Sequence, residues 1–323
     1  MTRSDPQRGA ALLSILFIVA ALAVAALIAT MAITQQTTLA KAASRRADSG
    51  WAAYSAEAVA LSAIAEMSSI TNGQLTPLTT GLSQPVVLPL RGGVVSMQVS
   101  DASNCFNVNA LANPDEGAAT LARLSWASLL SDLDIPATEA NGLANALADW
   151  LDADANTRQG GAEDGYYLTL SPAYRAANQS MDSPAELASV LGYTKALREA
   201  LAPMICARPE SQMVLLNINT LRPDQASLLR ATYSEALSLA AAERILLDRP
   251  DTGWASVAEF EALPDIRTIP EGQKRTDALS TISTTYLAEG QTTLDGGSWP
   301  FSFIISAANG AEPQTIWRRL GEE

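Results

Sequence analysis

Histidine is absent from this chain of 323 residues, and cysteine occurs only twice. The chain therefore has no Ser-His-Asp triad, no Cys-His pair, no histidine zinc site and no site of four thiolates. Lysine and arginine total 21 against 34 acidic residues, a net charge of −13. Such a chain repels phosphate backbones, so no nucleic acid is expected as a partner. A Ser-Lys dyad would have to use Lys41, Lys195 or Lys274, and we expect no enzymatic activity.

One long apolar run lies near the N-terminus. It extends from Ala10 to Ile33, and its only polar members are Ser14 and Thr30. As a helix it would be about 36 Å long, enough to cross a hydrocarbon core of about 30 Å. A cleaved secretory signal has a shorter apolar region, so cleavage by signal peptidase at the small-residue end Met31-Ala32 is a disfavoured alternative. The sequence predicts one membrane span, and the basic residues on both sides of it leave the orientation undecided.

A short basic leader precedes the span. Arg8-Gly9 is followed by the apolar run without a spacer. This leader is similar to that of a type IV prepilin, which a membrane peptidase cuts after the glycine on the cytoplasmic side. Cleavage would fall between Gly9 and Ala10. An ordinary signal anchor with a chance glycine is the alternative.

The N-terminal helix should continue beyond the membrane. Small and apolar residues recur at spacings of three and four from Leu39 to Ala65, and Thr71-Asn72-Gly73 suits a helix end. The prediction is one helix from about residue 10 to 70. A span that leads without a linker into an amphipathic helix is the form of a pilin spine.

Strands are expected on both sides of a long helical block. Val86–Leu90 and Val94–Ser100 flank Gly92-Gly93 as a hairpin. Further strands are expected at 280–288, 301–305 and 315–320, the last two joined by a turn at Asn309-Gly310. Helices are expected at 116–130, 137–151, 183–192, 194–201, 223–233, 239–248 and 257–262. The fold class is therefore α+β, with an all-helical insertion in an antiparallel sheet.

The helical block contains a short internal sequence repeat. Phe106-Asn107-Val108-Asn109 and Leu216-Asn217-Ile218-Asn219 each precede a helical unit, which predicts two related modules in tandem. The second is similar to a helix-hairpin-helix module, which grips phosphates through glycine amides. The predicted turn after Arg230 lacks glycine, and the chain is acidic, so a protein-interaction module is preferred to a DNA-binding one.

An acidic loop follows the second predicted helix of the block. Counted from Asp152, it has the spacing D-x-D-x-N and reaches glutamate at position twelve, as a calcium loop does. Thr157 replaces the glycine of an EF-hand at position six, so a calcium loop of another geometry is expected. A solvated acidic turn is the alternative. The candidate ligands are Asp152, Asp154, Asn156, Glu163 and Asp164.

The two cysteines precede the two modules. Cys105 and Cys206 lie beside related strand segments, and could be bridged if those segments pair. A disulfide and two free buried thiols both remain open, because geometry decides between them.

Taken together, these segments resemble the K-type minor pseudopilins of type II secretion systems. The most specific stretch runs from Asp149 to Gln179, and includes the segments DWLDAD, GGAEDGYY and YRAANQ. The leader, the Phe106 and Leu216 segments and the apolar run add to it, so that the resemblance covers nearly the whole chain.

The resemblance implies a pilin-like fold with a helical insertion, calcium at the acidic loop, and a place at the tip of the pseudopilus. It implies I- and J-type minor pseudopilins as partners, with H-type and the major pseudopilin left open, and processing by prepilin peptidase. It places the chain in the inner membrane with a periplasmic C-terminal domain. Most pilins carry glutamate where this chain has Ser14, a lack that K-type members share. Many pilins begin with phenylalanine where this chain has Ala10.

Seven segments are expected on this basis: leader 1–9, membrane helix 10–33, periplasmic helix 34–72, first strands 73–103, a SAM-like module 104–213, a helix-hairpin-helix-like module 214–275, and C-terminal strands 276–323. The expected function is initiation of the filament that exports folded proteins across the outer membrane. The alternatives are a minor pilin of a type IV pilus and a signal-anchored periplasmic hydrolase.

Overall fold

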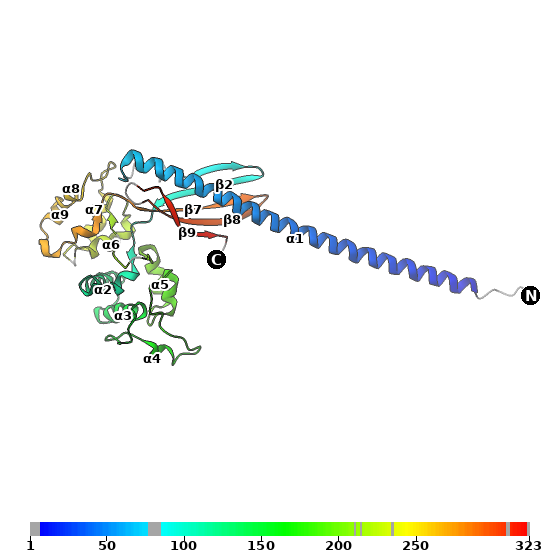
Figure 1. Ribbon diagram of the computed structural model, residues 1–323, viewed down its shortest axis with the longest axis horizontal. Coiled ribbons are helices and arrows are strands. Elements are labelled where there is room, and N and C mark those ends of the chain that lie inside the picture. The colour runs from blue at the N-terminus through cyan, green and yellow to red at the C-terminus, as the bar shows by residue number, and fades with distance from the viewer. Residues whose placement is uncertain are drawn as a thin grey trace, which may run out of the picture.

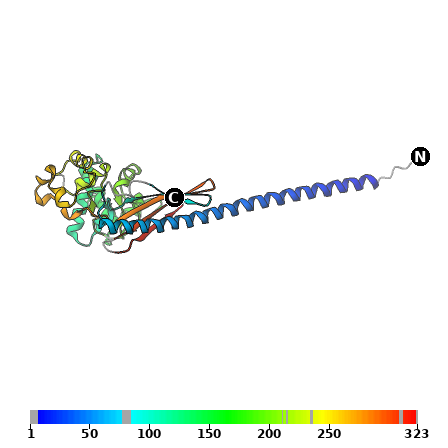
Figure 2. The same cartoon turned by 90° about the horizontal axis from the view of Figure 1, so that it is seen from above.

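A long N-terminal helix dominates the shape of the molecule (Figure 1). The computed structural model describes residues 7–76, 85–209, 211–213, 215–233, 236–307 and 311–321. Helix α1 (Gln7–Thr71) is 65 residues long. Its apolar part from Leu12 to Ile33 is exposed throughout and projects away from the rest of the chain, as Figures 1 and 2 show. The predicted single helix is confirmed.

The second half of α1 lies on an antiparallel sheet. Small side chains on one face of the helix are buried, among them Ala53, Ala56 and Ala60. They allow the helix to approach the sheet closely, where Phe303 and Tyr286 fill the interface and are fully buried. The second half of α1 therefore covers a sheet, as expected, but with another face than the predicted one. Leu39, Trp51 and Tyr54 of the stripe predicted between Leu39 and Ala65 are exposed, because alanines and not aromatic side chains fit the close approach to the sheet.

Five strands form this sheet in the order β1-β2-β7-β8-β9. All neighbouring pairs are antiparallel. The strands are β1 (Val86–Leu90), β2 (Gly93–Asp101), β7 (Thr285–Leu294), β8 (Gly297–Ser306) and β9 (Gln314–Leu320). Because β2 and β7 are hydrogen-bonded neighbours, everything between Asp101 and Thr285 is an insertion between two adjacent strands. The predicted helical insertion in a sheet is confirmed.

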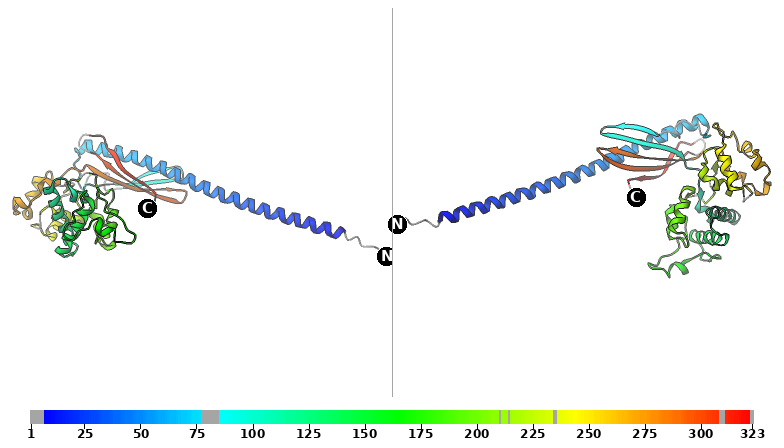
Figure 3. Two further views of the ribbon diagram at one scale, coloured as in Figure 1. Left: turned by 60° about the horizontal axis from the view of Figure 1, so that its bottom comes forward. Right: turned by 180° about the vertical axis from the view of Figure 1, so that it is seen from behind.

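The insertion is helical and forms its own core at the end of the molecule away from the N-terminus (Figure 3). Its helices are α2 (Glu116–Ser131), α3 (Ala137–Leu151), α4 (Asp164–Tyr167), α5 (Lys195–Leu201), α6 (Ala226–Ala231), α7 (Leu239–Leu247), α8 (Val257–Glu261) and α9 (Pro264–Arg267). One contiguous apolar cluster extends from Phe106 through Trp126 to Leu279, so the two halves of the insertion share a single core.

The internal sequence repeat corresponds to a repeated structure. Strand β3 (Phe106–Asn107) pairs in parallel with β4 (Ile205–Cys206), and β5 (Leu216–Asn217) pairs in parallel with β6 (Leu279–Ser280). In each copy the first asparagine accepts a bond from the backbone N–H of the second. The second asparagine then bonds both backbone groups of a distant residue, Met181 in one copy and Trp254 in the other.

Two predicted elements differ from the structure. The strand expected at 280–288 begins only at Thr285, because Leu279 and Ser280 pair with β5 in the insertion. It continues to Leu294, where Asp295 and Gly296 adopt positive φ values of 45° and 80° and make the hairpin turn. The helix expected at 183–192 is a 3-10 turn (Pro184–Ser189) with the capping box of Ser183 and Glu186. The turn expected at Asn309-Gly310 lies outside the described residues.

Candidate metal centre

The acidic loop connects α3 to α4 on the underside of the insertion (Figure 1). Helix α3 ends at Leu151, and Asp152 is its C-terminal cap. The chain is then irregular until Glu163, which is the N-terminal cap of α4. The helix ends therefore bring two candidate ligands, Asp152 and Glu163, back toward each other.

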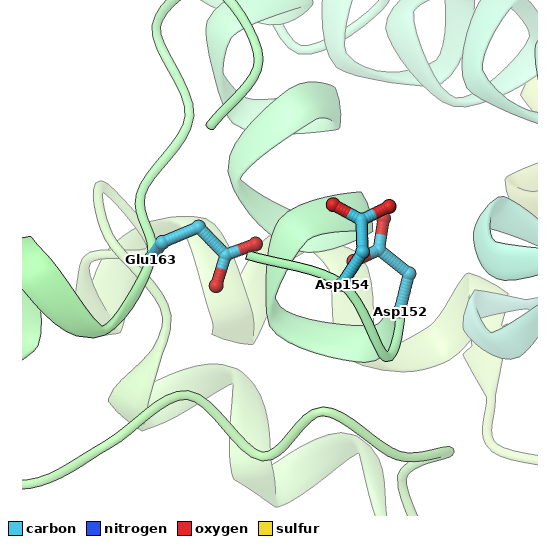
Figure 4. Close-up of side chains that lie close together, drawn as sticks. All are labelled: Asp152, Asp154 and Glu163. Carbon is cyan, nitrogen blue, oxygen red and sulfur yellow. The ribbon is translucent and has the colours of Figure 1, made fainter. Parts of the chain in front are cut away.

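Three carboxylates converge in this loop. Ligand oxygens of Asp152, Asp154 and Glu163 all lie within 4.8 Å of one another. Figure 4 shows Asp152 and Asp154 side by side at the end of α3, with the side chain of Glu163 directed toward them from the opposite side of the loop. The residues at positions one, three and twelve of the calcium-loop spacing, counted from Asp152, therefore lie together.

Glu163 is the most unusual member of this cluster. Only 5% of the residue is exposed, and within the described chain neither carboxylate oxygen has a hydrogen-bond partner. Oδ1 of Asp152 is also buried without a partner there. Burial, followed by the charges of the neighbouring aspartates, raises the pKa of Glu163 to about 7. Buried oxygens without donors are costly unless something positive satisfies them.

The donor set suits a hard cation. Calcium binds six to eight oxygen ligands in flexible geometry, and a late glutamate can supply two of them. The chain has no histidine and its two cysteines form a disulfide, so neither ligand type is available to favour zinc or a softer metal. The arrangement fits calcium by the chemistry of its donors and by the unsatisfied oxygens of Glu163.

The remaining two candidates occupy other positions. The backbone N–H of Asn156 donates to Oδ1 of Asp154 at 2.7 Å, so this residue shapes the turn. Asp164 pairs with Arg175 at 2.6 Å and also accepts the backbone N–H of Ala176 at 3.0 Å. The carboxylate of Asp164 is therefore directed to the middle of the segment between α4 and Pro184.

The loop does not turn as an EF-hand does. Thr157 keeps a negative φ, and the residue in the left-handed region is Gly160, with φ of 79°. Gly161 lies directly against the carboxylate of Asp149, where an added Cβ would come within 2.0 Å of Oδ2. The two glycines therefore let the chain close around a buried aspartate.

Two residues that shape the loop, Asp149 in the last turn of α3 and Arg158 in the loop itself, were not recognised as such from the sequence. Asp149 is completely buried, and Arg158 donates to it from both its backbone N–H and its guanidinium. Burial raises the pKa of Asp149, and these bonds act in the opposite direction. The available signal was that Arg158 is the single cation between residues 149 and 164.

The other candidate residues lie far from this loop. Gly9 and Ala10 are in the first turns of α1, and Ser14 follows in its exposed part. Cys105, which directly precedes β3, forms a disulfide with Cys206 of the neighbouring strand β4, with Cα atoms 5.7 Å apart.

Comparison with known proteins agrees with this architecture. Two family models, both described as "Type II secretion system (T2SS), protein K", match residues 104–210 and 216–281. A type II secretion system protein K of Pectobacterium carotovorum subsp. carotovorum is 33% identical over 84% of this chain and 83% of its own length. The chain belongs to the type II secretion system protein K family. The protein K of Klebsiella pneumoniae is 32% identical over 81% of each chain.

A solved structure supports the same family at the level of the fold. It is the complex of GspK, GspI and GspJ from the type 2 secretion system of enterotoxigenic Escherichia coli. The matching chain has a TM-score of 0.75 and 30% identity, and the match covers 84% of this chain and 95% of the other. The protein K fold thus includes the α1 and sheet unit together with the helical insertion.

Proposed function

We propose that this chain is a minor pseudopilin that assembles with I- and J-type minor pseudopilins at the tip of the type II secretion pseudopilus. The observation that carries the proposal is the combination of a pilin-like helix and sheet with a helical insertion between β2 and β7. The solved complex of GspK with GspI and GspJ supports the choice of partners. H-type and major pseudopilins are further candidates for neighbouring positions.

The exposed apolar half of α1 anchors the chain before assembly. Its side chains from Leu12 to Ile33 have no cover within the described chain, and a bilayer or a bundle of similar helices would supply it. Under the proposal, prepilin peptidase cuts between Gly9 and Ala10, and the folded domain stands in the periplasm on the outer side of the inner membrane. The disulfide suits an oxidising compartment of this kind.

Two features suit the tip. Ser14 stands where most pilins have a glutamate that neutralises the N-terminal ammonium of a neighbour in the apolar bundle, and an uncompensated charge there is costly. A subunit without this carboxylate fits the position where no such contact is required. The helical insertion also occupies the end of the molecule away from the membrane helix, where a further subunit would stack (Figure 3).

The proposed role is structural. The chain would act by presenting surfaces for assembly, and the loop of Asp152, Asp154 and Glu163 would bind calcium. The bound ion would satisfy the buried oxygens of Glu163 and tie α3 to the start of α4. The calcium ion would act as a structural cross-link and would take no part in a reaction.

A secretion assay tests this function. In a bacterium whose own protein K gene is deleted, expression of this chain with the I- and J-type pseudopilins of its own system should restore export of a secreted enzyme. The chain with Gly9→Leu should accumulate in the membrane without restoring export. Normal export in cells that lack every protein K would refute the proposal.

A further inference from the structure

The acidic loop contains a cation of its own. Nη1 of Arg158 donates to Oδ1 of Asp149 at 2.8 Å and to Oδ2 of Asp152 at 2.5 Å. The two carboxylates differ in their surroundings. Asp149 lies beside the cluster of three carboxylates and its side chain is completely buried, whereas Asp152 is a member of the cluster. One guanidinium group therefore links a buried anchor to a candidate calcium ligand.

Asp149 also holds the backbone at this point. Its Oδ2 accepts the backbone N–H of Arg158 at 3.1 Å, and Gly161 closes against the same carboxylate. These contacts do not involve Asp152. The course of the loop at Arg158 is therefore fixed through Asp149, and the bond between the guanidinium and Asp152 can break without releasing the backbone.

The two carboxylate oxygens of Asp152 have different surroundings. Oδ2 is held by Arg158, while Oδ1 is buried and has no hydrogen-bond partner in the described chain. A divalent cation bound by Asp152, Asp154 and Glu163 would stand a few ångströms from the guanidinium. Like charges at that separation in a partly buried site repel strongly.

We propose that Arg158 competes with calcium for Asp152 and thereby sets the calcium affinity of the loop. Asp149 is the positioning residue that retains the guanidinium when Asp152 turns to the metal. This inference rests on the calcium site proposed above. It makes the loop a weak site that fills where calcium is abundant, as it is outside the cytoplasm.

The affinity of the full-length chain for calcium, measured by isothermal titration calorimetry in detergent micelles, tests the proposal. Arg158→Gln should lower the Kd about tenfold, because the competing charge is gone. Arg158→Lys keeps the charge and should stay within about threefold of the wild type. Arg175→Gln is the matched control: it removes an arginine that pairs with Asp164 outside the cluster, and should leave the Kd within about twofold.

The outcomes separate the two proposals. An affinity gain on Arg158→Gln cannot arise from damage to the fold, so it supports competition. An unchanged or weaker affinity, beside normal calcium binding by the wild type, overturns the role of Arg158 and leaves the calcium site intact. No calcium binding by the wild type overturns the site and the inference together.

A second measurement covers the case in which Arg158→Gln does not fold. In the wild-type chain labelled with ¹⁵N-arginine, calcium should shift the guanidinium signal of Arg158 and leave that of Arg175 unchanged. The Arg158→Lys variant identifies the signal. A guanidinium signal of Arg158 that does not respond to saturating calcium overturns the proposal.

Discussion

Arg318 of β9 forms a two-pronged ion pair with Glu57 of α1. Nε and Nη2 of the arginine donate to the two carboxylate oxygens at 2.8 Å and 2.7 Å. Glu57 is buried beneath the last strand, and the bonds from Arg318 lower the pKa of its carboxyl group. The pair joins residues 261 positions apart and fastens the edge of the sheet to the spine helix.

The first prediction concerns this pair and pH. A carboxyl group whose pKa is lowered on folding stabilises the protein above its ordinary value of 4.5, and this contribution is lost as pH falls through the lower folded value. Glu57→Gln should therefore reduce the unfolding temperature by several degrees near neutral pH and by less near pH 3. Thermal unfolding followed by circular dichroism at both pH values measures the difference.

Glu66→Gln is the control for this prediction. Glu66 lies on the exposed side of the same helix, so its loss should change the unfolding temperature little at either pH. Equal effects of the two substitutions at neutral pH would show that the pair with Arg318 does not stabilise the fold.

The second prediction concerns the disulfide between Cys105 and Cys206. It closes a separation of 101 residues, and a cross-link over a loop of that length stabilises a fold by about 2–5 kcal/mol. Reduction should lower the denaturant midpoint of the wild type. The double variant Cys105→Ser with Cys206→Ser should already have the lower midpoint and should not respond to the reductant. A wild-type midpoint that is insensitive to complete reduction would contradict this expectation.

The third prediction identifies the calcium ligands. Calcium at about one hundred times its Kd should stabilise the chain by about 2.7 kcal/mol. Asp154→Asn and Glu163→Gln should each remove most of this stabilisation, because both carboxylates belong to the cluster. Asp164→Asn should retain most of it, since Asp164 pairs with Arg175. Calcium titrations followed by thermal unfolding, with magnesium at the same concentration as a reference, provide the test.

The fourth prediction concerns the leader. Expressed with a prepilin peptidase, the chain should lose residues 1–9, and the intact mass of the membrane-extracted protein should show this loss. Gly9→Leu should leave the chain uncut. Ala32→Leu, which alters the alternative site for signal peptidase, should leave the processing unchanged. Cleavage near Ala32 in the wild type would contradict the prepilin interpretation.

Much of the fold could be predicted because the periodicity is strong. The apolar run and the three-and-four spacing that follows it predict the length of α1, although the predicted stripe lies on its exposed side. The paired Asn-x-Asn segments mark the two copies of the repeated structure in the insertion. The spacing of Asp152, Asp154 and Glu163 in the sequence was enough to predict that their carboxylates converge. The prediction succeeds because the ends of α3 and α4 fix the two sides of the loop.

Contacts between distant residues could not be predicted in the same way. Nothing local in the sequence indicates that Arg318 meets Glu57. Arg158 stands out locally as the single cation of the acidic segment, but only the folded loop shows that it bridges Asp149 and Asp152. The predicted start of β7 at Ser280 was wrong. Ser280 does lie in a strand, but tertiary structure pairs that strand with β5 inside the insertion and not with the main sheet. The sequence allowed the disulfide, and only the pairing of β3 with β4 decides it.

The central claim is that this chain assembles with I- and J-type minor pseudopilins. The most direct test is native mass spectrometry of the full-length chain co-expressed with the I- and J-type pseudopilins of its own system and extracted in detergent. We expect a complex with one copy of each subunit, which forms only when all three are present. Recovery of this chain alone, while the I- and J-type subunits remain together without it, would show that this chain does not assemble with them.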